Sequence, residues 1–158
     1  MPESPVVATL RANPWFAALQ PEHFDKLAAV AQETSWSAGQ VIFREGDVHD
    51  RFYLILEGTV ALEIYVPNRG RTTILTIGPN EVLGWSAVLP GTQQKTAGAR
   101  ASQPTRAVAF DAAGLRAACD EDHELGYYFY RRMTNVIAGR LTATRLQLLD
   151  MYAVDQPG

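Results

Sequence analysis

Residues 78–101 carry the side chains best suited to chemistry, because their types and order match an anion-binding cassette. The segment reads as a strand, a glycine, one helical turn, a loop and a basic residue that enters the next strand. Backbone N–H groups at the start of a helical turn bind anions, and Gly84, Ser86 and Ala87 stand where such groups would lie. Ser86 adds a hydroxyl donor and Lys95 adds a positive charge. The segment therefore indicates a site for a small anion.

Catalytic and metal-binding chemistry has little support in the sequence. The histidines His23, His49 and His123 are scattered and form no His-x-His pair, so a metal site of the cupin type is not expected. The single cysteine, Cys119, excludes an internal disulfide and a multi-cysteine zinc site, and no histidine stands at a recognisable motif spacing from it. Walker-type and dinucleotide-type glycine motifs are absent. We therefore expect no enzyme activity and no bound metal.

The composition is that of one globular domain. The chain has 158 residues, of which 47% are hydrophobic and 20% are charged, and its formal net charge is -3. This charge gives no overall basic field that would attract nucleic acid, and no apolar run is long enough to span a bilayer. Residues 1–9 contain no secretory signal, so we expect a cytoplasmic protein that does not contact a membrane.

Helices precede a run of short strands along the chain. We expect residues 1–9 to be a flexible lead and residues 10–158 to form one domain. Residues 11–32 show a helical spacing of apolar residues, broken by Pro21, which suits the first turn of a second helix. Residues 34–110 then show the alternation and turn residues of strands, at 40–43, 52–56, 60–66, 72–77, 95–101 and 106–110. This pattern predicts a mainly β fold, a barrel or jelly roll, flanked by helices.

Two helices are expected over residues 111–152, after the barrel. Asp111 can cap a short helix over residues 112–118, and a long helix follows from about Glu121 to Tyr152. A helix of this length cannot bury its whole apolar stripe on a small barrel, so pairing with the same helix of a second copy is the simplest use for it. The alternative is that the helix folds back wholly onto its own barrel. In the first case the seam of the homodimer contains the apolar positions Phe129, Met133, Val136, Ile137, Leu141 and Leu148.

Together these elements resemble the cyclic-nucleotide-binding domains of the catabolite-activator (Crp/Fnr) type. Residues 44–47 (Arg-Glu-Gly-Asp) and 52–60 resemble the glycine-punctuated hairpin of that family. Residues 78–84 resemble the start of its phosphate-binding cassette, although Asn80 stands where a glycine is usual. The resemblance covers about residues 10–152, and it implies an eight-stranded jelly-roll barrel with N-terminal helices and a long C-terminal helix.

The resemblance also implies a ligand site, with two diagnostic side chains changed. An acidic residue that accepts hydrogen bonds from a ribose 2′-OH is replaced by Trp85, and an arginine that grips the phosphate is replaced by Lys95. Lysine keeps the charge but loses the bidentate geometry of arginine. Thr144 lies in a segment that resembles the one whose threonine contacts adenine. The expected ligand-binding residues are thus Gly84, Trp85, Ser86, Ala87, Lys95, Thr96 and Thr144.

Two functions follow from this site. The first is a non-catalytic regulatory sensor that binds cyclic AMP, cyclic GMP or a related anion and shifts the arrangement of its C-terminal helices. The second is a degenerate member of the family in which Trp85 fills the former sugar site. Such a protein would bind no small molecule and would act as a dimeric scaffold for a protein partner.

Direct binding to DNA is not expected. Activator-type regulators continue into a helix-turn-helix domain, whereas seven residues follow Met151 in this sequence. The arginines of the long helix are balanced by nearby acidic residues and are interpreted as a solvated or interface face; they are Arg131, Arg132, Arg140 and Arg145.

Overall fold

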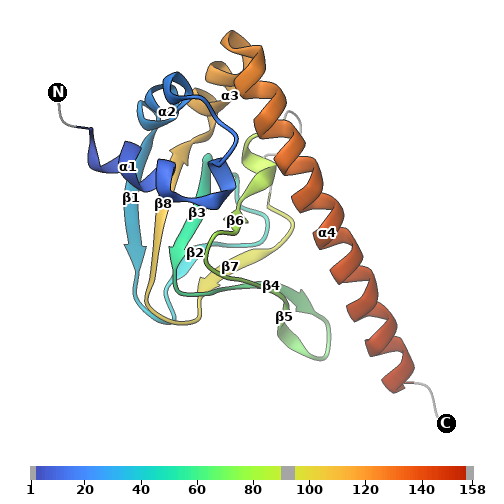
Figure 1. Cartoon of the computed structure of the whole chain (residues 1–158). Coiled ribbons are helices and arrows are strands. Elements are labelled where there is room, and N and C mark those ends of the chain that lie inside the picture. The colour runs from blue at the N-terminus through green and yellow to red at the C-terminus, as the bar shows by residue number, and fades with distance from the viewer. Residues whose placement is uncertain (1–2, 90–94, 156–158) are drawn as a thin grey trace.

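A computed structural model of the chain describes residues 3–89 and 95–155. These residues form two four-stranded antiparallel sheets that face each other as a jelly roll, with helices at one end and one long helix alongside (Figure 1). The strand orders are β1-β8-β3-β6 and β2-β7-β4-β5. The strands are β1 (Ala31–Trp36), β2 (Val41–Phe43), β3 (Arg51–Glu57), β4 (Val60–Val66), β5 (Gly70–Ile77), β6 (Val82–Leu83), β7 (Gly98–Ala101) and β8 (Thr105–Asp111).

The helices lie at both ends of the chain. The N-terminal ones are α1 (Pro5–Ala12), the 3₁₀ turn η1 (Pro14–Phe16) and α2 (Pro21–Ala28). A second 3₁₀ turn, η2 (Trp85–Ala87), follows β6, and α3 (Ala112–Glu121) and α4 (His123–Asp155) follow β8. No helix among the described residues combines the length and the apolar character needed to cross a membrane. The predicted architecture of a jelly roll with flanking helices is confirmed.

Strand β3 separates two apolar cores, because both of its faces are buried. Phe52 and Leu54 belong to the core under the helices, whereas Tyr53 and Ile55 belong to the core between the sheets. Its neighbour β6 pairs with it through Tyr53 and Leu54, and thereby holds the start of the cassette against the centre of the molecule. The cassette is therefore mounted on a strand that is buried on both faces.

Three expectations about local structure were wrong. Residues 5–9 of the expected flexible lead belong to helix α1, which begins at Pro5 because the Ser4 hydroxyl caps it by accepting from the N–H of Val7 at 3.2 Å. The expected helical segment 11–32 ends early, since α2 stops at Ala28 and Ala31 already pairs with Phe110 in the β1–β8 ladder. The strand expected over residues 95–101 begins only at Gly98, as β7.

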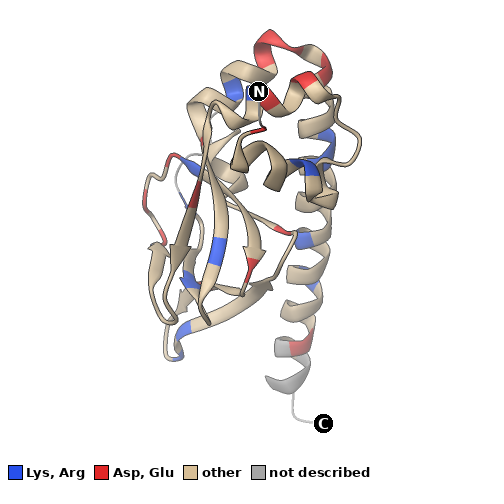
Figure 2. Cartoon of the chain, turned by 60° about the vertical axis from the view of Figure 1, so that its left-hand side comes forward, with Lys and Arg blue, Asp and Glu red and all other residues tan. Residues whose placement is uncertain are grey.

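An aspartate caps the start of each of the two C-terminal helices. Asp111 caps α3 as predicted, accepting from the N–H of Gly114 at 2.9 Å. Asp122 caps α4, since its Oδ1 accepts from Leu125 N–H at 3.1 Å. Its pKa is lowered to about 2, mainly by the hydrogen bond from Lys26 and then by the bond from Leu125. Acidic residues gather at this end of the molecule (Figure 2). The contacts of Asp122 with Lys26 and with Leu125 therefore tie the start of α4 to α2.

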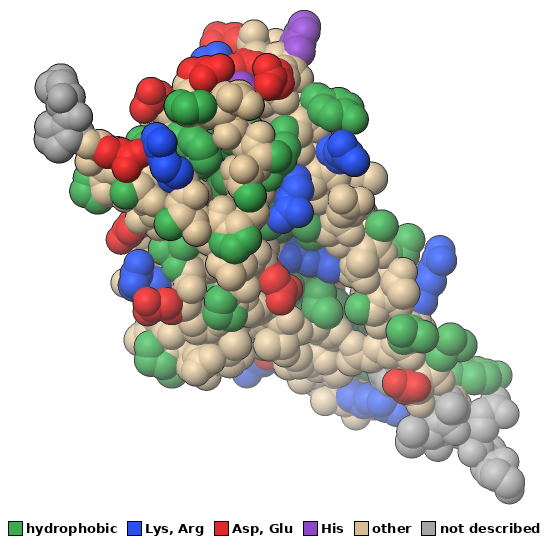
Figure 3. Space-filling view, in the orientation of Figure 1, with side chains coloured by type: hydrophobic (Ala, Val, Ile, Leu, Met, Phe, Trp, Pro, Cys, Tyr) green, Lys and Arg blue, Asp and Glu red, His purple; other side chains and the backbone are tan. Residues whose placement is uncertain are grey.

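Helix α4 buries only its first half, which corrects part of the predicted dimer seam. Phe129 and Met133 are 2% and 1% exposed and lie in the core of the same chain, so they offer no free surface to a partner. Val136 is packed in part against the same core. Leu141 and Leu148 are 50% and 60% exposed. Hydrophobic side chains are visible on the projecting end of the helix (Figure 3).

Candidate functional site

Gly84 forms the sharp turn from β6 into η2. Its φ of 87° lies in the left-handed region that favours glycine. A Cβ at this position would lie 2.8 Å from the carbonyl oxygen of Arg51 and 3.4 Å from Nζ of Lys95. Glycine is therefore required for two reasons, the backbone conformation and the close approach of the turn to β3.

This requirement makes a prediction for Gly84→Ala. A left-handed conformation costs a non-glycine residue about 1–2 kcal/mol, and the contact with the Arg51 carbonyl adds a further cost because backbone must move. Gly39→Ala is the matched control, since Gly39 has a φ of 86° but a Cβ there would meet no atom within 4 Å. Urea unfolding should show a clearly larger loss of stability for Gly84→Ala. Equal losses in the two variants would contradict the close packing of the turn on β3.

Lys95 lies beside this turn with its ammonium buried. The residue is 4% exposed, and its Nζ donates to Ser86 Oγ at 3.0 Å and to the Gly84 carbonyl at 3.5 Å. Nζ also lies 4.8 Å from the centre of the Phe43 ring. Burial lowers the pKa of Lys95 to about 8. Within residues 3–89 and 95–155 the ammonium has neutral partners and no paired carboxylate.

A small cavity of about 60 Å³ adjoins the ammonium. A water molecule takes roughly 30 Å³ in the liquid, so the cavity has room for about two waters or one compact oxyanion. Gly84, Ser86 and Lys95 form its polar part, while Phe43 and Leu83 form part of its apolar wall. The predicted cassette thus encloses a space that matches one anionic group.

A wider cleft of about 340 Å³ continues from this cavity toward α4. Trp85 and Thr96 line both spaces, and on the helix side the cleft is lined by Ile137, Leu141 and Thr144. The half-buried indole of Trp85 is therefore a wall common to the two spaces. The sequence left open whether Trp85 fills the site or lines it. In the structure Trp85 lines the site.

Most of the predicted site residues come together, with one exception. Gly84, Trp85, Ser86, Lys95 and Thr96 line the cavity, and Thr144 lines the cleft. Ala87 does not line either space. Its N–H donates to the Gly84 carbonyl at 3.0 Å, and its own carbonyl accepts from Arg116 at 2.5 Å. The amide of Ala87 is used inside the turn, so its expected role toward an anion is not supported in this arrangement.

Arg140 is the site residue that sequence reasoning missed. We expected Arg140 on a solvated or interface face of α4, but its guanidinium donates to the Val82 carbonyl of the same chain and lines both the cavity and the cleft. Burial lowers its pKa to about 10, while the nearby Glu81 acts in the opposite direction. A usable signal was its spacing: Arg140 lies one helical turn before Thr144, so both residues share one face of α4.

The remaining candidate chemistries receive no support from the described residues. Among them no cluster of three or more His, Cys, Asp or Glu side chains could hold a metal ion. Cys119 is buried, and burial raises the pKa of its thiol to about 12, far from that of a reactive thiolate. His49 shares a hydrogen bond of 2.8 Å with the Tyr53 hydroxyl and packs on the Phe43 ring, so it supports the wall of the cavity.

A family model and a curated relative place the chain in the same protein family. The family model described as "Cyclic nucleotide-binding domain" matches residues 33–122, more than half of the chain. A CRP-like cAMP-activated global transcriptional regulator of Mycobacterium tuberculosis is 30% identical over 145 residues, which cover 90% of this chain. The chain spans 62% of the length of that regulator.

Solved structures agree with the sequence matches. The catabolite activator protein of Thermus thermophilus superposes with a TM-score of 0.69 at 25% identity, covering 89% of this chain and 63% of that one. A cyclic nucleotide-binding domain from Methylobacillus flagellatus superposes with a TM-score of 0.77 at 21% identity, covering 97% and 83% of the two chains. At that identity the second likeness concerns the fold alone.

Proposed function

The chain belongs to the cyclic nucleotide-binding domain family, and on that premise we propose that it is a non-catalytic sensor of a cyclic nucleotide or a related anion. The anionic group occupies the cavity beside Gly84, Ser86 and Lys95, and the rest of the ligand occupies the cleft along α4. Trp85 offers the flat face of its indole to a ring system, in place of the acidic residue that the family uses for the ribose.

The observation that carries this proposal is the buried positive charge of Lys95. Transfer of an ammonium out of water is costly unless an opposite charge or good hydrogen bonds compensate it. Here the partners of Lys95 are a hydroxyl, a carbonyl and an aromatic ring, and a cavity remains next to them. An anion in that cavity would supply the missing opposite charge.

Contact with α4 gives the ligand a way to act on the rest of the molecule. Ile137, Leu141 and Thr144 of α4 line the cleft, and Arg140 bridges from the helix to Val82. A ligand in the cleft therefore touches the helix and the barrel at once. The ligand shifts helix α4 only if its affinity differs between two positions of that helix. The contacts that can create this difference are those with Arg140 and Thr144 of α4.

The exposed half of α4 supports a homodimer, which is the second part of the proposal. After the two buried positions are removed, exposed or partly exposed side chains at intervals of three, four or seven residues form one stripe along the helix. We name this the α4 stripe; it consists of Tyr130, Thr134, Ile137, Leu141, Leu148 and Tyr152. A parallel pairing of two such helices would cover it.

A scaffold without a small-molecule ligand is the second candidate. It is favoured by the size of the cavity, about 60 Å³, which cannot hold a whole nucleotide, and by the hydrogen bonds that Lys95 already makes to Ser86 and Gly84. In that case Trp85 would only complete the wall of the domain, and the α4 stripe and a protein partner would carry the function.

Calorimetric titration with cyclic AMP and cyclic GMP at low salt distinguishes the two candidates. Micromolar or tighter binding by the native protein, lost in Lys95→Met and kept in Lys26→Met, supports the sensor. Lys26 is the matched control because the sequence contains only these two lysines and Lys26 is an exposed residue of α2. Absence of heat and of thermal stabilisation with both nucleotides would contradict the sensor and leave the scaffold.

The pKa of Lys95 predicts how this affinity depends on pH. Because the pKa in the free protein is about 8, the ammonium that pairs with the anion is present at pH 7 and mostly lost at pH 9. Cyclic AMP keeps its phosphate charge over this range, so its affinity should fall by about tenfold from pH 7 to pH 9. Lys95→Arg keeps its charge and should show no such fall. A flat profile for the native protein would exclude Lys95 as the anion partner.

A further inference from the structure

A second groove lies on the other side of Arg140 from the candidate site. It has a volume of about 410 Å³ and separates α4 from the segment Asn80–Val82. Basic, acidic and hydrophobic side chains stand side by side at the junction between α4 and the barrel end (Figure 3). The groove has a cationic part, formed by Arg132 and Arg140, and an apolar part that includes Leu75 and Val136.

Arg132 lines this groove, and one of its side-chain hydrogen-bond donors has no partner among the described residues. Its guanidinium lies 5.0 Å from the centre of the Trp15 ring, and its Nε is buried without a hydrogen-bond partner among the described residues. The described part of the chain also pairs no carboxylate with it. One carboxylate, that of Glu81, faces two guanidinium groups across the groove, so the lining carries a net positive charge.

Gly139, a glycine within helix α4, also lines the groove. Glycine in the middle of a helix is less stable than alanine, and packing against a neighbour is the usual compensation. A Cβ on Gly139 would meet no atom within 4 Å, so packing inside this chain does not require a glycine there. The residue lies on the groove lining together with Ala143, one turn further along α4. Its missing side chain keeps the groove open.

We propose that this groove binds a small organic carboxylate with an attached flat apolar group. The planar fork of a guanidinium matches a carboxylate in a bidentate pair, and Arg132 lines the groove without a paired carboxylate among the described residues. The apolar group lies over Gly139 against Val136 and Leu75. The volume of the groove falls in the range of small-molecule sites. The groove shares Arg140 and Leu75 with the spaces beside the cassette, but Arg132, its proposed carboxylate partner, lines neither of those spaces.

Titration with 3-phenylpropanoate, followed by nuclear magnetic resonance, tests the proposal. Saturable binding with a dissociation constant on the order of one millimolar is expected, with shifts at the side-chain amide of Asn135 and at Nε–H of Arg132. The neutral 3-phenylpropanamide should bind at least about tenfold more weakly, because it lacks the charge. Absence of saturable shifts with the carboxylate, or equal binding of the two probes, would overturn the proposal.

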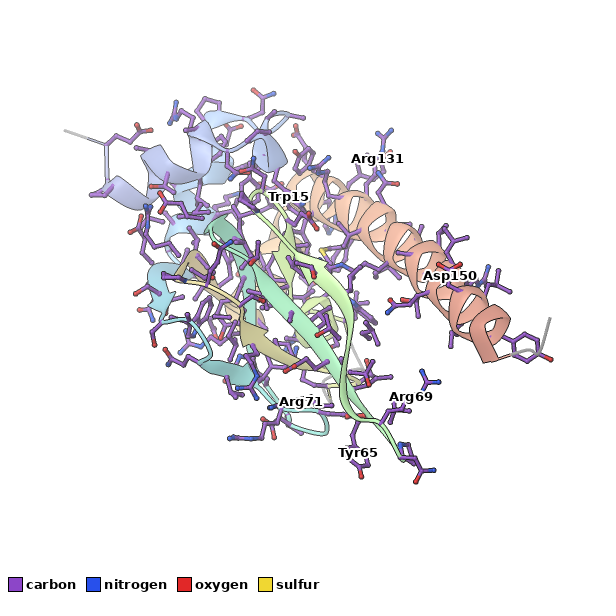
Figure 4. All side chains as sticks on the ribbon, turned by 90° about the horizontal axis from the view of Figure 1, so that it is seen from below. Trp15, Tyr65, Arg69, Arg71, Arg131 and Asp150 are labelled. Carbon is purple, nitrogen blue, oxygen red and sulfur yellow. The ribbon has the colours of Figure 1, made fainter. Side chains whose placement is uncertain are left out.

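Matched variants locate the site. Arg132→Met should weaken binding of 3-phenylpropanoate by about tenfold or more, and Arg131→Met should leave it within about twofold. Arg131 is the control because it is the preceding arginine on α4 and points away from the barrel (Figure 4). Gly139→Leu fills the groove without touching a charge and should also abolish binding. Lys95→Met should bind the probe like the native protein, and loss of binding in that variant would place the probe in the cassette instead.

Discussion

Replacing Lys95 with methionine is expected to abolish anion binding and, at the same time, to stabilise the fold. The native site keeps a charged group where burial disfavours charge, which lowers the pKa of Lys95 from 10.5 to about 8. A difference of this size corresponds to at most about 3 kcal/mol against the charged form at pH 7. Methionine fills a similar volume without that cost, so the free energy of unfolding should rise by about 1–3 kcal/mol after the lost bond to Ser86 is allowed for.

The pH dependence of stability gives an internal check on this prediction. In the unfolded chain Lys95 stays protonated up to about pH 10.5, whereas in the folded protein it loses its proton near pH 8. Between these values the unfolded state binds more protons, so the stability of the native protein rises with pH. The advantage of Lys95→Met should therefore shrink as the pH rises above 8. A constant advantage, or a less stable variant at pH 7, would contradict the assignment of Lys95 as a strained, functional charge.

The double substitution Leu141→Asp with Leu148→Asp is expected to convert a dimer into monomers. Both leucines lie on the α4 stripe and are exposed in the single chain. In a symmetric pair four such side chains would be buried, and each contributes about 1.5–3 kcal/mol when it is fully covered. Charges at the same positions add a desolvation cost, so association should weaken by several decades. The molar mass measured by light scattering should fall from about twice 17.4 kDa for the native protein to 17.4 kDa for the variant.

Leu146→Asp is the control for the dimer. Leu146 is also an exposed leucine of α4, but it lies five residues after Leu141 and therefore about 140° away around the helix. This variant should remain a dimer with unchanged mass. A native protein that has the mass of one chain at micromolar concentration would contradict the seam, and dissociation by Leu146→Asp would mean that a different face of α4 pairs.

The parts of the fold that were predictable are those that local chemistry dictates. A glycine at a left-handed φ, as at Gly84, and a side-chain cap, as at Asp111, leave marks within a few residues of the chain. The alternation of residues 60–66 likewise predicted β4. Strand β1 (Ala31–Trp36) was placed in part in a helix because it draws its structure from pairing with β8, far along the chain.

The candidate site shows the same division. Its turn and the basic residue beside it were predictable from the order of Gly84, Ser86 and Lys95 along the chain, whereas the burial of Lys95 was not. The expectation that Arg140 lies on a solvated or interface face missed its contact within the chain, since only the packing of α4 beside β6 allows its guanidinium to reach the Val82 carbonyl. Ala87 shows the reverse error, because its amide was expected at the ligand but closes the turn on Gly84.

The sequence by itself thus determined the fold class and most of the elements, and it gave the expectation of an anion site beside Gly84 and Lys95, since these depend on short-range spacing and on side-chain chemistry. The tertiary structure decided which face of α4 is buried, that Trp85 lines its cleft, and that Nε of Arg132 has no hydrogen-bond partner among the described residues. The physical reason is that an apolar stripe or a long basic side chain on a helix is compatible with several neighbours. Only the packing of that helix against the rest of the chain selects one of them.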